Sequence, residues 1–317
     1  MVTESVHVDV DDPIAETESV HVDVDDPIAE TESVHVDVDD PIAESFPLMV
    51  DAATRLCRKR DPNGVCFKYH RMWPYLRRLG RGGVWRYPGH FLDSFRELAR
   101  DGRSQRVLVS GCADYSLLAY ILHAYRAEGV EPVVAISDIC EAPLFINRWY
   151  AERHNASIRT LACDILDYPE DATLDVITTD NFISRILPNT RSLLLSKWRD
   201  LLRPGGKFVA TQQHIAQDPT FRDERVKAVR ARTLELAQAN PSVIDIAPEA
   251  VADYVAEYHA ARPSHPLPSL DELRQLFEDN GFRLEVMSRV SLRDGVEPHE
   301  SLSGTKSKRM GLVATRI

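Results

Sequence analysis

The chain has 317 residues, of which 44% are hydrophobic and 27% are charged, and its formal net charge at pH 7 is −11. This composition is that of a soluble globular protein and excludes fibrous and wholly disordered classes. No apolar run approaches the roughly 20 residues that a membrane span requires. The first residues lack both the basic and the apolar segment of a secretory signal, so we expect a cytoplasmic protein without membrane contact.

Residues 3–44 are three identical copies of TESVHVDVDDPIAE. The copies carry fifteen acidic residues and no Lys or Arg, whereas the rest of the chain has 34 acidic and 38 basic residues. Valine alternates with polar residues too briefly to offset the entropy of ordering such a segment. We expect residues 1–44 to form a disordered acidic tail. The alternative is that the tail docks on the basic residues 51–105, as a regulator or as a substrate.

Residues 45–105 combine many basic residues with aromatic ones, and their apolar spacing predicts helices near 48–60, 66–79 and 88–101. Three interpretations remain open. The aromatic residues pack on the domain that follows, or the region is a cap that closes over an acidic or aromatic small substrate, or it binds nucleic acid. No recognised nucleic-acid-binding motif is present, so we do not expect nucleic acid as a partner. Tyr69 and His70 are candidate substrate contacts of a cap.

From residue 106 onward, apolar strands alternate with helical patterns. Strands are expected at 106–110, 132–137, 157–162, 174–179 and 207–213, and helices at 115–127, 141–154 and 188–202. A helical insertion at 215–265, with helices at 219–239 and 247–261, comes before a capped helix at 270–279 and strands at 282–290 and 309–316. The pattern predicts a doubly wound α/β fold. Its mostly parallel seven-stranded sheet would have a C-terminal antiparallel strand, and the ligand pocket would lie at the carboxyl ends of the parallel strands.

Several segments, in chain order, resemble those of class I S-adenosylmethionine-dependent methyltransferases. VLVSGCADY resembles the glycine-rich turn after the first strand, ISD the acidic end of the second strand, and ACDIL the turn after the third. LDVITTDNF resembles the fourth strand, LLRPGGKFVATQ the helix, turn and fifth strand, and NGFRLEVMS with KRMGLVATRI the terminal antiparallel pair. The resemblance covers residues 106–317 apart from the insertion. It implies S-adenosylmethionine as cofactor and methyl transfer to a small-molecule acceptor.

The resemblance also implies where the cofactor binds. Gly111 has no Cβ and lets the backbone approach the cofactor closely. Asp138, at a strand end, can accept hydrogen bonds from both ribose hydroxyls. Asp164 and Ile165 suit the edge and the face of the adenine, although either acid could instead cap a helix or face solvent. The expected cofactor contacts are Ser110, Gly111, Ala113, Tyr115, Asp138, Ile139, Asp164, Ile165 and Thr179.

Candidate acceptor-side residues follow the fourth and fifth strands. His214 has a near-neutral reference pKa and is the candidate general base, and Asp180 could orient an amine. The expected substrate contacts are Tyr69, His70, Asn181, Phe182, Arg185 and Gln213. The five cysteines form no CxxC pair and no cluster has metal-ligand spacing along the chain, so we expect reduced thiols and no metal.

One departure from the family leaves alternatives open. Ala113 and Tyr115 stand where the family's first turn carries further glycines, and Tyr115 would lie beside the methionine part of the cofactor. It could stack there or block the site. The second hypothesis is therefore a non-catalytic cofactor-binding or regulatory module with a methyltransferase fold. A third is self-modification of the N-terminal repeats.

Overall fold

The computed structural model describes residues 38–57, 64–103, 105–169, 173–214, 222–262, 265, 269–291 and 308–317, with only the backbone for residues 214, 222 and 308. The first two repeat copies and the start of the third lie outside these ranges. None of the helices in the described part of the chain has the length and hydropathy that crossing a membrane requires.

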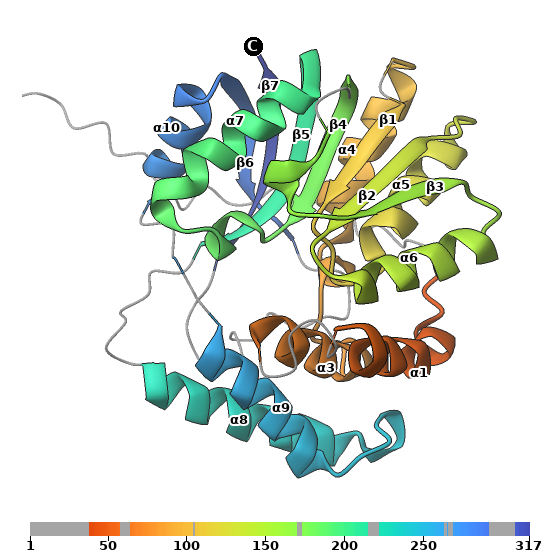
Figure 1. The fold of residues 1–317 in the computed structure, drawn as a ribbon, viewed down its shortest axis with the longest axis vertical. Helices are drawn as coiled ribbons and strands as arrows, with labels where there is room; N and C mark the ends of the chain where they lie inside the picture. The colour runs from red at the N-terminus through yellow and green to blue at the C-terminus, as the bar shows by residue number, and fades with distance from the viewer. Residues whose placement is uncertain are drawn as a thin grey trace, which may run out of the picture. The chain divides into compact units, whose positions relative to one another are not determined.

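A seven-stranded sheet forms the centre of the fold, in the order β3-β2-β1-β4-β5-β7-β6 (Figure 1). The strands are β1 (Arg106–Ser110), β2 (Val133–Asp138), β3 (Ile158–Ala162), β4 (Leu174–Asp180), β5 (Leu202–His214), β6 (Phe282–Arg289) and β7 (Lys308–Arg316). Strands β1 to β5 are parallel, and β7 runs antiparallel to both of its neighbours. The predicted fold class is confirmed.

Helices cover both faces of the sheet because the side chains of the central strands are apolar on both sides. Val107 and Val109 of β1 belong to the core beneath one layer of helices, whereas Leu108 belongs to the core on the opposite face. The first layer holds α4 (Pro88–Arg100), α5 (Ser116–Ala127) and α6 (Glu141–Arg153), and the second holds α7 (Arg191–Leu201) and α10 (Leu270–Asp279). Short helical turns lie at Val84–Arg86, Ile165–Asp167, Ile183–Arg185, Pro188–Thr190 and Pro241–Val243.

The remaining helices form a separate group beside the carboxyl ends of the parallel strands (Figure 1). They are α1 (Ile42–Ala52), the π-helical turn η1 (Ala53–Cys57), α3 (Val65–Arg78), α8 (Arg222–Ala239) and α9 (Pro248–Ala261). Met72 and Leu76 of α3 pack against Val229, Val255 and Tyr258 from α8 and α9. The N-terminal region and the insertion, which we predicted as two separate helical segments, therefore share an apolar core.

The boundary predicted at residue 44 is corrected by the structure. Helix α1 begins at Ile42, inside the third repeat copy, and Val38 is buried. Asp40 forms an ion pair of 2.8 Å with Arg77 of α3, and Glu44 forms one of 2.7 Å with Arg153 of α6. The apolar residues that follow the repeat favour a helix, and this helix includes the last residues of the repeat, from Ile42 onward. Docking of the earlier copies remains a prediction, because they lie outside the described residues.

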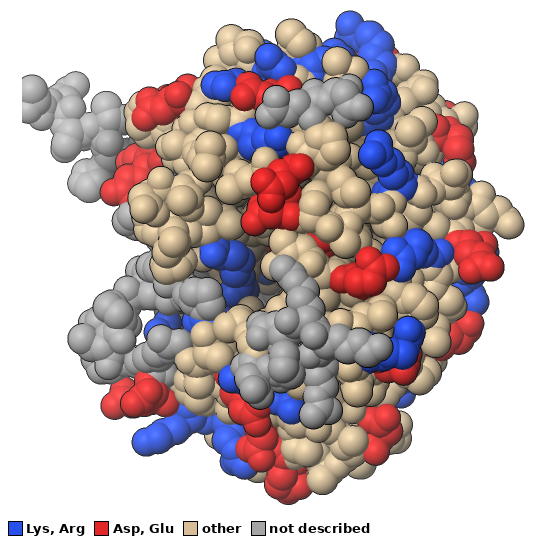
Figure 2. All heavy atoms as spheres, viewed as in Figure 1, with Lys and Arg blue, Asp and Glu red and all other residues tan. Residues whose placement is uncertain are grey.

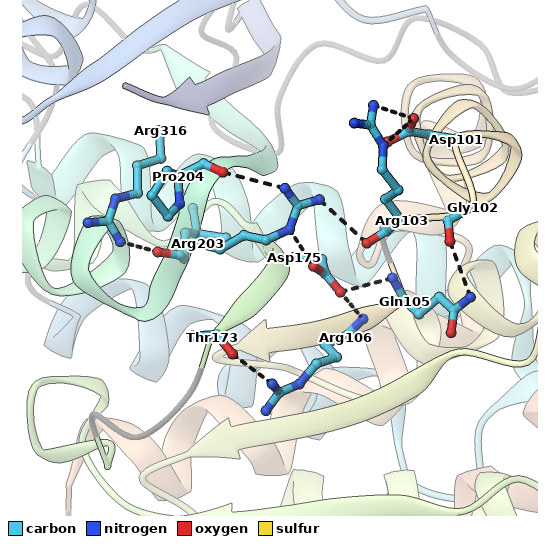
Figure 3. Close-up of polar contacts among 11 residues, drawn as sticks. Asp101, Gly102, Arg103, Gln105, Arg106, Thr173, Asp175, Arg203, Pro204 and Arg316 are labelled. Carbon is cyan, nitrogen blue, oxygen red and sulfur yellow. Dashed lines mark hydrogen bonds and ion pairs between the residues drawn. The ribbon is translucent and has the colours of Figure 1, made fainter.

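A polar network joins β1, β4 and β5 at their amino-terminal ends, on the side of the sheet away from the helical group (Figure 3). The carboxylate of Asp175 accepts hydrogen bonds from the backbone N–H groups of Gln105 and Arg106 at 3.1 and 2.8 Å. Its other oxygen accepts from Arg203 Nε at 2.6 Å. Asp175 is 8% exposed, so these bonds replace most of its hydration. The network fixes the start of β1 against β4.

Replacing Asp175 by alanine should lower the free energy of unfolding by about 2–4 kcal/mol, because it leaves two backbone donors and a guanidinium without their acceptor. Asp200→Ala is the matched control: the side chain of Asp200 is 51% exposed and, within the described part of the chain, forms an ion pair with the adjacent Arg199. The control should change the free energy of unfolding by less than about 0.5 kcal/mol. Urea denaturation followed by circular dichroism measures both, and equal effects would contradict the role of the network.

Candidate functional site

A cavity of about 570 Å³ lies between the carboxyl ends of the parallel strands and the helical group. Its walls come from α3, the Arg81–Tyr87 segment, the β1–α5 turn, the ends of β2, β4 and β5, α9, and the β6 and β7 strands. Figure 2 shows a hollow between the part of the molecule that carries the sheet and the part that carries the helical group, with basic side chains at its wall. The cavity lies where the alternation of strands and helices predicted a pocket.

The turn after β1 requires a glycine for two separate reasons. Gly111 has a φ of +74°, in the left-handed region that favours glycine. A Cβ on Gly111 would also lie 2.6 Å from Cε2 of Phe182, a contact that no real Cβ tolerates. Both residues border the cavity, together with Ala113. The aromatic ring therefore lies against bare backbone at the entrance to the predicted cofactor site.

Asp138 borders the same cavity from the end of β2. Its Oδ2 accepts a hydrogen bond of 3.0 Å from the N–H of Cys112, and its Oδ1 accepts one of 2.8 Å from the N–H of Cys140. These bonds hold the carboxylate between the β1–α5 and β2–α6 turns. Desolvation raises the pKa of Asp138 to about 6, although the nearby His70 and both N–H groups act in the opposite direction. The carboxylate remains the main form at neutral pH.

Ile139 follows Asp138 and also borders the cavity. Its side chain is 46% exposed, which is unusual for a large aliphatic residue beside a hydrophobic core. A carboxylate next to an exposed aliphatic side chain can hold the hydroxyls of a ribose while covering an adjoining planar ring. The location of both residues fits the role that the resemblance implied.

Three of the predicted cofactor contacts lie elsewhere. Tyr115 is fully buried against Tyr150, with ring centroids 4.6 Å apart, and its hydroxyl donates to Asp40 Oδ1 at 2.7 Å. Ser110 Oγ accepts from Trp198 Nε1, and Thr179 Oγ1 donates to the carbonyl of Ser110. None of the three belongs to the cavity wall. The prediction for them is corrected: Tyr115 anchors the segment before α1 and does not block the site.

Asp164 and Ile165 lie in the turn after β3. The carboxylate of Asp164 accepts a hydrogen bond of 3.0 Å from the N–H of Leu166 and caps a short helical turn. Ile165 is 5% exposed and packs in the core beneath α7. The capping bond uses one carboxylate oxygen of Asp164, so its contact with the adenine remains a prediction.

The cavity wall also contains most of the residues predicted for the acceptor side, namely Asp180, Asn181, Phe182, Arg185 and Gln213. Asp180 pairs with Arg309 of β7 at 2.5 Å and accepts from Thr211. Asn181 has a φ of +53°, and its Oδ1 accepts from the N–H of Gln213 at 3.1 Å. The backbone of His214 ends β5, but its side chain lies outside the described atoms, so its role as base remains a prediction.

Among the arginines of the cavity wall, sequence reasoning had identified only Arg185. Six arginines border the cavity against three carboxylates; they are Arg81, Arg86, Arg185, Arg262, Arg289 and Arg309. Desolvation, followed by repulsion from Arg86, lowers the pKa of Arg81 to about 10. Desolvation and the nearby Arg185 likewise lower the pKa of Arg262 to about 10. Arg86 Nε is buried without a hydrogen-bond partner among the described residues.

Aromatic residues and a histidine complete this part of the cavity. Three aromatic rings line it: the ring centroid of Tyr69 lies 5.3 Å from that of Trp73 and 5.2 Å from that of Tyr258. Burial, followed by repulsion from Arg262 and Arg185, holds the pKa of His259 well below its ordinary value. His259 is therefore a neutral imidazole at neutral pH. No motif in the sequence identified this residue, which lies in the last turn of helix α9 in the insertion.

A buried ion network connects the helical group to the β1–α5 turn. The side chain of Arg77 is 3% exposed and contacts Asp40 and Asp114, each at 2.8 Å. Asp114 borders the cavity and also accepts from Trp73 Nε1 at 2.9 Å and from the N–H of Ser116 at 2.8 Å. One guanidinium therefore ties α3, the last repeat copy and the turn that contains Gly111.

Cys57, Cys66, His70 and Cys140 converge at one end of the cavity, which Cys66 and His70 border. Their sulfur and nitrogen atoms all lie within 4.8 Å of one another. The expectation that no group of residues has the arrangement of metal ligands is therefore corrected. His70, predicted as a substrate contact, lies with these thiols.

No protein-family model matches the chain, and no curated protein matches it. Solved structures do align with it. The Burkholderia thailandensis 1,6-didemethyltoxoflavin-N1-methyltransferase is 16% identical over 90% of this chain and 93% of that one, with a TM-score of 0.46. The geranyl diphosphate C-methyltransferase of Streptomyces coelicolor is 14% identical over 71% and 77%, with a TM-score of 0.44. The N-methyltransferase NodS of Bradyrhizobium japonicum is 11% identical over 71% and 85%, with a TM-score of 0.43.

The sheet order, with β7 inserted antiparallel between β5 and β6, decides the architecture. The result is a doubly wound α/β fold with the terminal antiparallel pair that the resemblance in sequence implied. The TM-scores of these structures lie below one half, so the function is inferred from the cavity itself.

Replacing Gly111 by alanine should destabilise the protein more than the same change at Gly129. Both glycines have a φ of +74°, but a Cβ on Gly129 would meet nothing within 4 Å. Each change costs about 1–2 kcal/mol for the left-handed backbone, and Gly111→Ala adds about 1–3 kcal/mol for the clash with Phe182. Urea denaturation of the two variants measures the difference. Equal losses would show that the ring moves away freely.

Proposed function

We propose that the protein transfers a methyl group from S-adenosylmethionine to a small anionic molecule. The observation that carries the proposal is the location of Gly111, Asp138 and Ile139. They border a single cavity, which arginine and aromatic side chains also line. A nucleoside cofactor and an acidic acceptor therefore fit side by side.

The cofactor end suits a sulfonium nucleoside. Asp138 is held by two backbone N–H groups, and its remaining lone pairs can accept from the two ribose hydroxyls. Ile139 offers an exposed aliphatic surface for the adenine. The bare backbone at Gly111 leaves room for the chain that joins the ribose to the methionine group.

Methyl transfer from a sulfonium is an in-line displacement in which the acceptor atom approaches the methyl group opposite the sulfur. Alignment of the two molecules supplies much of the barrier reduction. The positive charge of the sulfonium disappears during the step, so an enclosed site with little water favours it. The helical group supplies that enclosure, with α3 and α9 forming the wall opposite the strand ends.

The arginines indicate the charge of the acceptor. Arg81 and Arg262 are desolvated and repel neighbouring arginines, which is unfavourable until an anion enters. A carboxylate or phosphate would also supply an acceptor for the buried Nε of Arg86. Trp73, Tyr87 and Tyr258 offer aromatic surfaces for the body of the same molecule.

His259 is the candidate base when the acceptor atom carries a proton. Its depressed pKa keeps the imidazole neutral and able to accept a proton inside a basic cavity. Asp180 is held by Arg309, which favours a role in orienting the acceptor. His214 remains a second candidate base.

The sequence left two other functions open, a non-catalytic module and self-modification of the repeats. The feature that favoured a non-catalytic module was Tyr115, and its side chain packs away from the cavity. Self-modification of the repeats has no supporting contact among the described residues, since residues 38–44 are held at the surface of α3 and α6.

Replacing Asp138 by alanine should weaken the binding of S-adenosylhomocysteine about 10–100-fold, because hydrogen bonds to a charged group are lost. Asp200→Ala is the control and should leave the affinity within about twofold, because Asp200 is 51% exposed on α7 and lies outside the cavity wall. Isothermal titration calorimetry with S-adenosylhomocysteine measures both. If the wild-type protein does not bind the cofactor, the proposal fails; if Asp200→Ala has the larger effect, the role of Asp138 is wrong.

The acceptor is tested with tritiated S-adenosylmethionine and a panel of aromatic and isoprenoid acids, each beside its uncharged amide or alcohol. We expect transfer to acids and none to their neutral counterparts. With an active acid, Arg86→Gln should raise KM about tenfold or more, because an ionic hydrogen bond to the substrate is lost. Arg100→Gln is the control, since Arg100 is 66% exposed and pairs with Glu128. Transfer only to neutral acceptors would contradict the assignment, and cofactor binding without transfer would favour the non-catalytic alternative.

A further inference from the structure

Three thiols and one imidazole meet in a small volume next to the cavity. Cys57 Sγ lies 3.4 Å from Cys66 Sγ and 3.4 Å from His70 Nδ1, and Cys66 Sγ lies 3.6 Å from the same nitrogen. Cys140 Sγ completes the group, in which all four atoms lie within 4.8 Å of one another.

The four residues come from three separate segments. Cys66 and His70 stand one helical turn apart on α3, so both side chains lie on one face of that helix. Cys57 ends the π-helical turn η1, and Cys140 immediately precedes α6. Cys57 and Cys140 are 0% and 1% exposed, and His70 is 8% exposed. Ala52, Ala142, Leu56, Phe67 and Phe145 form the apolar surroundings.

We propose that Cys57, Cys66, His70 and Cys140 bind one Zn²⁺ ion with tetrahedral geometry. Zn–S bonds of about 2.3 Å and Zn–N bonds of about 2.0 Å at tetrahedral angles place neighbouring ligand atoms about 3.5–3.8 Å apart. The distances of 3.4, 3.4 and 3.6 Å among Cys57, Cys66 and His70 lie within about 0.4 Å of this spacing. Four protein ligands fill the coordination sphere, which is the arrangement of a structural rather than a catalytic zinc site.

Other occupants fit the group less well. An iron–sulfur cluster needs room for bridging sulfides between its thiolates, and the ligand atoms here are too close together for that. A disulfide between Cys57 and Cys66 would employ two of the four residues and leave no role for His70 and Cys140. Three thiolates and an imidazole are ligands that zinc prefers, and binding releases the three thiol protons to solvent.

The ion would link three separate segments of the fold. It would join η1 and α3 of the helical group to the turn between β2 and α6. Cys140 would bind zinc through its sulfur, and its backbone N–H donates to Asp138 at 2.8 Å. The zinc site would therefore hold in place the turn that positions Asp138. Cys140 is a positioning residue in this account.

The test is the metal content of the full-length protein, purified without a histidine tag and without added metal. Inductively coupled plasma mass spectrometry should find one zinc ion per chain in the wild type and in Cys163→Ser, whose thiol is outside the group. Cys140→Ser should retain less than about a tenth of that zinc, because a thiolate ligand is lost. Wild-type protein without stoichiometric zinc, or with iron in its place, would overturn the assignment.

A second measurement does not depend on the variants folding. Mercurial titration of the wild-type thiols should release one zinc ion per chain, detected with a chromogenic chelator. Exchange with Co²⁺ should give the intense visible absorption of tetrahedral thiolate coordination. A mass two daltons below that of the reduced chain, with no metal released, would identify a disulfide instead and contradict the proposal.

The positioning role rests on the proposed function and is tested separately. Zinc-depleted protein should bind S-adenosylhomocysteine about tenfold more weakly than the zinc-loaded protein, and affinity should return when zinc is restored. Equal affinity with and without zinc would overturn the positioning role. If neither form binds the cofactor, the proposed function fails, while the metal content still decides the zinc site.

Discussion

The buried guanidinium of Arg77 forms the two ion pairs on which the arrangement of the site depends. It lies between Asp40 and Asp114 and is almost inaccessible to water. A charge buried in this way is stable only while its partners remain in place, and losing one typically costs about 3–5 kcal/mol. Because the partners belong to the last repeat copy and to the β1–α5 turn, the helical group cannot shift without breaking the network.

This constraint explains how a largely parallel sheet acquires a closed cavity. The carboxyl ends of the strands would otherwise open to solvent, as in any doubly wound fold. Here the helices before β1 and the helices after β5 pack on one another and cover those ends together. The cover brings arginines from distant parts of the chain into one desolvated volume, and the repulsion among them favours a negatively charged ligand.

The sequence predicted the sheet well because its strands are apolar on both faces and end in recognisable polar residues. Gly111 and Asp138 could be located for the same reason, since strand ends converge in this topology. Tyr115 was misplaced, because sequence position alone does not say to which side of a turn a side chain projects. The proposed zinc ligands were missed because their proximity arises only when three separate segments fold together. His259 and most of the arginines were missed because segments distant in the sequence bring them to the cavity.

The end of the third repeat copy is part of the folded protein, with Asp40 and Glu44 in ion pairs and Val38 in the core. The same residues stand at the same places in all three copies. Gain or loss of whole fourteen-residue units would therefore always restore an identical junction with α1. The length of the acidic tail can thus vary during evolution in discrete steps without altering the described contacts that the folded domain makes with its last copy.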